Sequence, residues 1–214
     1  MLVFPTRDGR FYEYENIRMI KALSHKIEAG QLQIYCVEGL ADETFYCFWR
    51  HPADRIKRYI QYEEYLLNEV IPFMNAKNDH PCIISHGLSL GAFYAANIAF
   101  RHPQVFRKLS AFSGRYDLTQ PIDWFGDLFD GYYDENIYFN TPCHFLPNLT
   151  DETLLNSLRE MDIILVIGKE DPFLENNRYL SQTLWDKGVG NALYEWDGRA
   201  HQGSAWRRMA PLYI

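Results

Sequence analysis

The stretch from Pro81 to Phe100, PCIISHGLSLGAFYAANIAF, constrains the fold more than any other part of the chain. It opens with a short apolar run, Cys82 to Ile84, that is typical of a buried strand. A glycine-flanked turn at Ser89 follows, and an alanine-rich apolar stretch that Pro103 stops then predicts a helix. Glycines on both sides of a serine let neighbouring backbone come so close that a Cβ would clash. Strand, Gly-x-Ser-x-Gly and helix together predict a tight turn that exposes the serine hydroxyl.

Strand patterns alternate with helix patterns along the chain. Several of the strands are continuously apolar, as strands are when both faces of a sheet are covered. The sequence therefore predicts an α/β fold with a mostly parallel sheet of about six strands and helices on both faces. The predicted strands are Leu2 to Pro5, Leu32 to Val37, Cys82 to Ile84, Lys108 to Ser113, Asp162 to Ile167 and Ala192 to Trp196.

Apolar residues at helical spacing predict the connecting helices. Gly30 ends the first of them, while Asp54 and Thr150 are good N-caps for two others. Besides the helix after Ser89, the helices are expected over about Glu15–Ala29, Asp54–Pro72, Thr150–Glu160, Leu174–Lys187 and Ala205–Met209.

Composition restricts the class of protein. Of the 214 residues, 47% are hydrophobic, which suits one domain with a buried core over residues 1–214. The net charge of −7 argues against nucleic acid as the main partner. No apolar run approaches the roughly 18 residues that span a membrane, and no signal-peptide pattern is present. The four cysteines form no CxxC pair, and Cys36 and Cys82 fall in predicted strands. We therefore expect reduced thiols, no metal or cofactor, and a cytoplasmic location.

A serine hydroxyl becomes a strong nucleophile when a histidine takes its proton and an acid orients that histidine. Of the seven histidines, only His201 follows the last predicted strand in a loop of small and polar residues, WDGRAHQGS. Asp171 directly follows the strand DIILVI; Glu170 on the same loop and Asp117 are alternative acids. In α/β folds, loops at the carboxyl ends of strands carry such groups. The order Ser89, Asp171, His201 therefore predicts a catalytic triad.

An acyl-transfer site also needs two backbone N–H donors for the oxyanion of the transition state. Leu90 follows the predicted nucleophile and supplies the first amide. The second is expected from the loop after the first strand, from Thr6 or Arg7, and the sequence leaves open which of these two amides faces the site.

Residues 114–150 follow the fourth predicted strand and show no clear period, so we expect a lid-like insertion. They carry nine aromatic and six acidic residues. An aromatic wall with an acidic rim would suit an apolar or aromatic acyl group, with Tyr116, Trp124 and Phe125 as substrate contacts. The alternative is that these aromatic side chains only pack the insertion onto the core.

Four segments resemble one known family: SHGLSLGA, NIAFRHPQVFRKLSAFSGRYDL, IGKEDPF and WDGRAHQGSAW. They are similar to the putative esterase family of α/β-hydrolases, which includes esterase D-like carboxylesterases, feruloyl esterases and mycobacterial mycolyltransferases. The resemblance covers nearly the whole chain. It implies a serine esterase that cleaves small-molecule esters through an acyl-enzyme, with Ser89 as nucleophile, Asp171 as acid and His201 as base. Acyl transfer by the same triad, or a binding protein that kept the fold, are the alternatives.

The N-terminus departs from that family. α/β-hydrolases normally have two strands before the one predicted here at Leu2 to Pro5. Without them, the strand Leu32 to Val37 would form an exposed edge of the sheet, which invites pairing with another chain. We therefore expect either an incomplete N-terminus or an edge that a second subunit covers in a homodimer.

Overall fold

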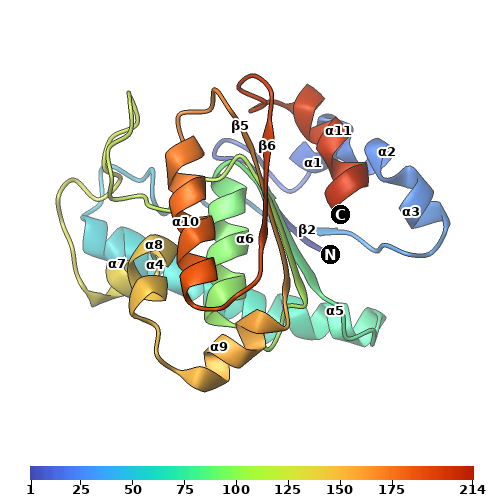
Figure 1. Ribbon diagram of the computed structural model, residues 1–214, viewed down its shortest axis with the longest axis horizontal. Coiled ribbons are helices and arrows are strands. Elements are labelled where there is room, and N and C mark those ends of the chain that lie inside the picture. Colours follow the sequence, from blue (N-terminus) through green and yellow to red (C-terminus); the bar gives the residue numbers. More distant parts are fainter.

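Six parallel strands form one sheet in the computed structural model, which describes residues 1–214 (Figure 1). The strands are β1 (Leu2–Phe4), β2 (Tyr35–Cys36), β3 (Ile84–Leu88), β4 (Lys108–Phe112), β5 (Asp162–Gly168) and β6 (Ala192–Trp196). Their order across the sheet is β2-β1-β3-β4-β5-β6, and each pair is parallel. The predicted α/β fold and number of strands are confirmed.

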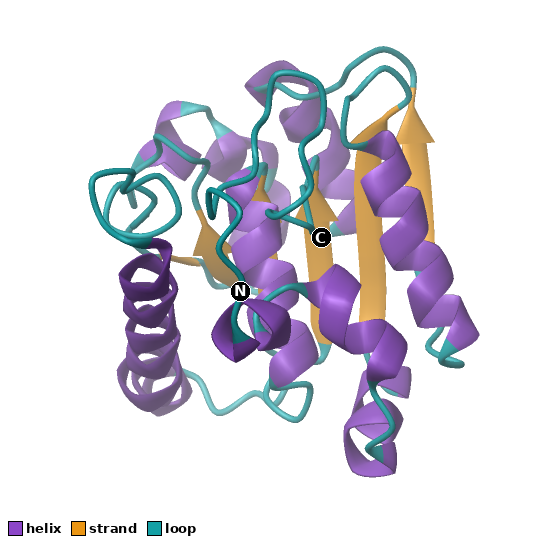
Figure 2. Cartoon of the chain, turned by 90° about the vertical axis from the view of Figure 1, so that its left-hand side faces the viewer, coloured by secondary structure: helices purple, strands orange, loops and turns teal.

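Helices cover both faces of this sheet (Figures 1 and 2). They are α1 (Glu13–Asn16), α2 (Met19–Ala22), α3 (Ser24–Glu28), α4 (Pro52–Tyr65), α5 (Ile71–Lys77), α6 (Leu90–Arg101), α7 (Glu135–Phe139), α8 (Pro142–Phe145), α9 (Glu152–Arg159), α10 (Leu174–Asp186) and α11 (Gly203–Tyr213). In Figure 1, α4, α6 and α10 lie on one side of the strands, and α1, α2, α3 and α11 lie on the other.

Alternate residues of the strands supply two separate hydrophobic cores. Leu2 and Phe4 of β1 belong to the larger core, under α6, whereas Val3 between them belongs to the smaller core, under α11. β5 divides in the same way, with Leu165 on one face and Val166 on the other. Burial on both faces is the reason that these strands read as continuous apolar runs.

The first predicted helix, Glu15 to Ala29, is wrong as one element. Three short helices occupy this region, and Arg18 between the first two adopts a left-handed backbone with φ of 62°. A non-glycine residue in that conformation interrupts the helical hydrogen bonds. The prediction followed the apolar stripe, which the short helices keep, because Ile17, Ile20 and Ile27 still pack against the smaller core.

The ends of other strands and helices also differ from the predicted ones. β3 begins at Ile84, so Cys82 is exposed before the strand and not buried in it as predicted, although all four cysteines are free. The helix expected to end near Pro72 continues, because a π-helical turn leads from α4 into α5 and Pro72 lies in the first turn of α5. At α9 the capping residue is Asp151, not Thr150; its carboxylate accepts from the Thr153 amide at 2.8 Å.

β2 has two residues and lies at one edge of the sheet, as expected from the family's strand order. Its only strand partner is β1, through the pairs Leu2–Tyr35 and Val3–Cys36. None of the helices has the length and apolar character that crossing a membrane requires.

Candidate active site

Ser89 lies between the end of β3 and the start of α6, and therefore at the carboxyl end of the parallel strands. Its φ of 56° and ψ of −119° are unusual for a residue with a side chain, and such strained residues cluster at functional sites. The flanking glycines are required, since a Cβ on Gly87 would lie 2.0 Å from the Gly91 carbonyl oxygen and one on Gly91 would lie 2.3 Å from that of Phe4. The predicted tight turn is therefore present.

Two further side chains predicted from sequence form a hydrogen-bonded series with Ser89. The Ser89 hydroxyl and His201 Nε2 are 2.9 Å apart, and His201 Nδ1 is 2.7 Å from Asp171 Oδ2. The Asp171 carboxylate is buried, and its Oδ1 accepts from the Phe173 amide at 3.0 Å, which fixes its orientation. The loops that carry this acid and this histidine touch at Gly168, where a Cβ would lie 1.9 Å from the Arg199 carbonyl oxygen.

The alternative acids do not reach His201. Glu170 is exposed beside Asp171. Asp117 instead accepts from His144 Nε2 at 3.1 Å and from the Thr119 hydroxyl at 2.7 Å. These two hydrogen bonds hold the pKa of Asp117 below its usual value although burial opposes them. Of the three acids that the sequence offered, only Asp171 pairs with the histidine at Ser89.

His86 precedes the turn and lies completely buried in β3. Its Nδ1 is 2.5 Å from the Ser110 carbonyl oxygen, to which it donates. Burial lowers the pKa of His86 to about 4, so this imidazole is neutral near pH 7. Its ring packs edge-on against Tyr14 and Phe112. It therefore supports the strand beneath the serine and the neighbouring helix α1.

The two predicted sources of the second oxyanion donor differ in the structure. The Thr6 amide donates to Glu13 Oε2 at 2.7 Å, and the Thr6 hydroxyl donates to Glu13 Oε1 at 2.5 Å. The Arg7 amide donates to no group of the protein. Leu90 is the first residue of α6, where helix amides have no intrahelical acceptor. Of the three amides predicted as oxyanion donors, those of Leu90 and Arg7 are therefore free, and that of Thr6 is not.

No sequence pattern predicts the role of Glu13. It lies on a helix of four residues and has no apolar periodicity to mark it. The available signal was Gly9, because a Cβ at that position would lie 2.2 Å from Glu13 Oε2. A glycine four residues before a glutamate is, however, too common a pattern to indicate this packing.

A cavity of about 310 Å³ opens beside Ser89. Of the predicted substrate contacts, Phe125 lines this cavity, with its ring centroid 4.8 Å from that of Phe173. Trp124 does not line it; this side chain is 71% exposed and packs against Phe125. Tyr116 is not brought to the cavity, contrary to expectation, because its side chain is completely buried. The lining residues are Thr6, Arg7, Asp8, Glu13, Tyr46, Ser89, Leu90, Arg115, Leu118, Phe125, Phe173, His201 and Trp206.

The acidic residues of the segment 114–150 do not form the expected rim of this cavity. Asp127 accepts from the Phe129 and Gly131 amides, and Asp134 caps α7. Asp130 pairs with the buried guanidinium of Arg55. Short acidic side chains are common in turns because they accept hydrogen bonds from nearby backbone, and here they serve that purpose.

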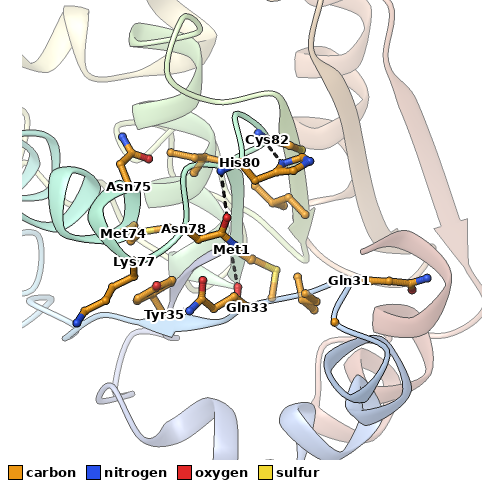
Figure 3. Close-up of a pocket in the computed structure, with 14 residues that line it drawn as sticks. Met1, Gln31, Gln33, Tyr35, Met74, Asn75, Lys77, Asn78, His80 and Cys82 are labelled. Carbon is orange, nitrogen blue, oxygen red and sulfur yellow. Dashed lines mark hydrogen bonds between the residues drawn. The ribbon is translucent and has the colours of Figure 1, made fainter.

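A second cavity, of about 750 Å³, lies beside the opposite ends of the strands (Figure 3). Met1, Gln33, Tyr35 and Cys82 lie around it in this view. The hydrogen bonds in it involve backbone amides and the terminal amine, such as Cys82 N to His80 Nδ1 at 3.2 Å. It has no hydroxyl or thiol hydrogen-bonded to a histidine, so the cavity at Ser89 is the candidate active site. No group of three or more His, Cys, Asp or Glu side chains is arranged to hold a metal ion.

Comparison with known proteins gives a family and a set of related folds. Residues 42–208 match the model of a family described as "Putative esterase". A solved ferulic acid esterase is 18% identical, with a TM-score of 0.71 over 99% of this chain and 80% of its own. An S-formylglutathione hydrolase from Agrobacterium tumefaciens is 15% identical, with a TM-score of 0.70 over 98% of this chain and 79% of its own. An S-formylglutathione hydrolase from Staphylococcus aureus is 13% identical, with a TM-score of 0.63 over 98% of this chain and 76% of its own. At these identities the likeness establishes the α/β-hydrolase fold alone. No curated protein sequence matches the chain.

Proposed function

Since the chain belongs to the family described as "Putative esterase" and is a carboxylic ester hydrolase, we propose that it cleaves esters through a catalytic triad of Ser89, His201 and Asp171. The hydrogen-bonded series from Ser89 Oγ to His201 Nε2, and from His201 Nδ1 to Asp171 Oδ2, carries this proposal. In it, each group has the partner that its role requires.

The roles follow from this geometry. His201 Nε2 takes the hydroxyl proton as Ser89 Oγ attacks the ester carbonyl carbon, and Asp171 stabilises the imidazolium that forms. The imidazolium then protonates the leaving alcohol, which leaves an acyl group on Ser89. Water, activated by the same histidine, attacks this acyl-enzyme, and the carboxylic acid departs.

We assign the oxyanion donors to the amides of Leu90 and Arg7. The dipole of α6 adds to the Leu90 amide, because the helix begins there with its positive end at the site. The Thr6 amide is unsuitable, since the Glu13 carboxylate already accepts from it. Under this assignment Glu13 is a positioning residue, because it holds Thr6 while the amide of the next residue, Arg7, stays free.

The remaining lining suits a small-molecule ester. Phe125 and Phe173 supply apolar surface beside Ser89, and Trp124 packs against Phe125. Residues 114–150 contribute Arg115, Leu118 and Phe125 to the lining, which supports a covering role for this segment over the site.

Labelling with a fluorophosphonate probe tests the proposal. The wild-type chain should react at Ser89, and Ser89→Ala should not react. Ser157→Ala is the matched control, because Ser157 is a half-buried serine of α9, away from the cavity, that bonds only to the Thr153 carbonyl. Labelling that persists in Ser89→Ala would show that another residue is the nucleophile. Product analysis with added alcohols then separates hydrolysis from acyl transfer.

A further inference from the structure

Arg115 is a buried cation in the lining of the cavity at Ser89. The residue is 5% exposed and follows β4 by three positions, at the start of the segment 114–150. Its guanidinium carbon lies 5.8 Å from the ring centroid of Phe173, which lines the same cavity. Burial lowers the pKa of Arg115 from its usual value, but a guanidinium remains charged in proteins. Of the other charged lining residues, Arg7 pairs with Asp8, and both Glu13 oxygens accept from Thr6, so Arg115 is the charge of this lining that no group of opposite sign meets.

No carboxylate of the protein pairs with this charge. Arg115 takes part in none of the salt bridges, whereas the other buried arginine, Arg55, pairs with Asp130. The two aspartates whose charges act on Arg115 are engaged elsewhere: Asp117 with His144 and Thr119, and Asp127 with two amides of its own turn. An unpaired buried charge is costly, so an arginine in this state is unusual unless a ligand supplies the anion.

The donors of Arg115 divide into two sets. Nε donates to the Asp117 carbonyl at 3.0 Å, and Nη2 donates to the carbonyls of Gln120 and Gly126 at 2.7 and 2.8 Å. These bonds fold the loop around one edge of the guanidinium. Nη1, on the other edge, is buried and has no acceptor. Holding the loop therefore leaves Nη1 unused.

We propose that Arg115 binds a carboxylate of the substrate through Nη1, so that the preferred substrates are anionic esters such as half-esters of short dicarboxylic acids. This inference rests on the proposed ester hydrolysis at Ser89. A carboxylate beside the guanidinium would neutralise the buried charge and satisfy the free donor. The apolar side chains of Phe125, Phe173 and Leu118 would contact the methylene groups between the carboxylate and the ester.

Two matched pairs of esters test the proposal, with hydrolysis followed by pH-stat titration. Monoethyl glutarate and ethyl pentanoate differ by a carboxylate in the acyl part. The second pair, 4-acetoxybutanoate and butyl acetate, differs by a carboxylate in the alcohol part. Wild-type enzyme should have the higher kcat/KM for the anionic member of at least one pair. Preference for the neutral member of both pairs would overturn the proposal without any variant.

Variants of Arg115 then assign the preference. In Arg115→Met the anionic-to-neutral ratio of kcat/KM should fall about tenfold or more, and Arg115→Lys should retain part of it. The ratio is taken within one variant, so a general loss of activity or folding cancels. Arg107→Met is the control, because Arg107 is exposed at the other end of β4, beside Glu160, and loses the same charge. An unchanged ratio in both Arg115 variants would overturn the proposal while leaving ester hydrolysis intact.

A binding measurement is independent of turnover. In Ser89→Ala, N-ethylglutaramate should bind more tightly than N-ethylpentanamide in calorimetry, and adding Arg115→Met should remove the difference. Where the preference lies in the alcohol part, 4-acetamidobutanoate and N-butylacetamide take their place. Equal binding within both pairs of amides contradicts the proposal even if the chain proves not to be a serine esterase. Failure of fluorophosphonate labelling at Ser89, by contrast, contradicts the proposed function itself.

Discussion

Two carboxylates hold the groups that surround Ser89, and they do so in different ways. Asp171 accepts from a side chain, His201, and is fixed by the amide of Phe173. Glu13 accepts from the backbone and the hydroxyl of Thr6. The first carboxylate orients the proposed base, and the second orients a loop whose next amide is a proposed oxyanion donor.

The supports of these carboxylates also differ. Asp171 follows the longest strand of the sheet, between β5 and α10. Glu13 lies on α1, a helix of four residues, and helices so short depend on tertiary packing. That packing comes from the next residue, Tyr14, which is buried against His86 with ring centroids 5.6 Å apart. We infer that the oxyanion side is the easier of the two to perturb.

The largest effect is expected on the base side. Asp171→Asn keeps the shape of the side chain but removes the charge that stabilises the imidazolium and favours the required tautomer of His201. In serine hydrolases this change costs about 10⁴ in kcat. Stopped assays with 4-nitrophenyl acetate at pH 7.5 measure it. Glu170→Gln, on the same loop, is the control and should keep wild-type kcat; equal losses in both variants would remove the assignment of Asp171.

A smaller loss of activity is expected on the oxyanion side. Glu13→Ala releases Thr6 and lets the Arg7 amide move, which should lower kcat by about 10- to 100-fold with little change in KM, less than the full loss of a donor. Glu13→Gln retains one acceptor oxygen and should fall between wild type and Glu13→Ala. An increase in kcat for Glu13→Ala would reverse the assignment, because it would mean that Glu13 blocks the Thr6 amide as the true donor.

The smallest effect concerns His86, which supports α1. Its folded pKa of about 4 lies below the ordinary value of 6.5, so the unfolded chain binds more protons between these pH values. The contribution of neutral His86 to the free energy of unfolding is therefore fully present above pH 6.5, and it is lost as the pH falls towards 4. Urea unfolding should show a loss of about 1 kcal/mol between pH 7.5 and 5.5 from this group. His86→Gln should lose less over the same interval, and identical pH slopes in both proteins would rule the histidine out.

More of the base side of the site than of its oxyanion side could be predicted from the sequence. Ser89, Asp171 and His201 could be proposed because each follows its own predicted strand and each role demands a particular side chain. The oxyanion loop could be narrowed only to Thr6 or Arg7, since any residue has an amide. The structure separates them through Glu13, which no periodicity or motif had marked. The prediction that a second subunit covers the edge at β2 stays a prediction.

What the sequence determined by itself was the parallel sheet, the turn at Ser89 and the chain order of the proposed triad. Periodic burial and glycines at close backbone approaches are local properties, so they leave a direct record in the residues. The tertiary structure decided which groups are left unpaired: the Arg7 amide and Nη1 of Arg115. Whether a polar group has a hydrogen-bond partner depends on residues that are distant in sequence, and no local sequence pattern carries that information. The same reason explains why Tyr116, an aromatic residue in the predicted segment, is buried in the core while its neighbour Arg115 lines the cavity.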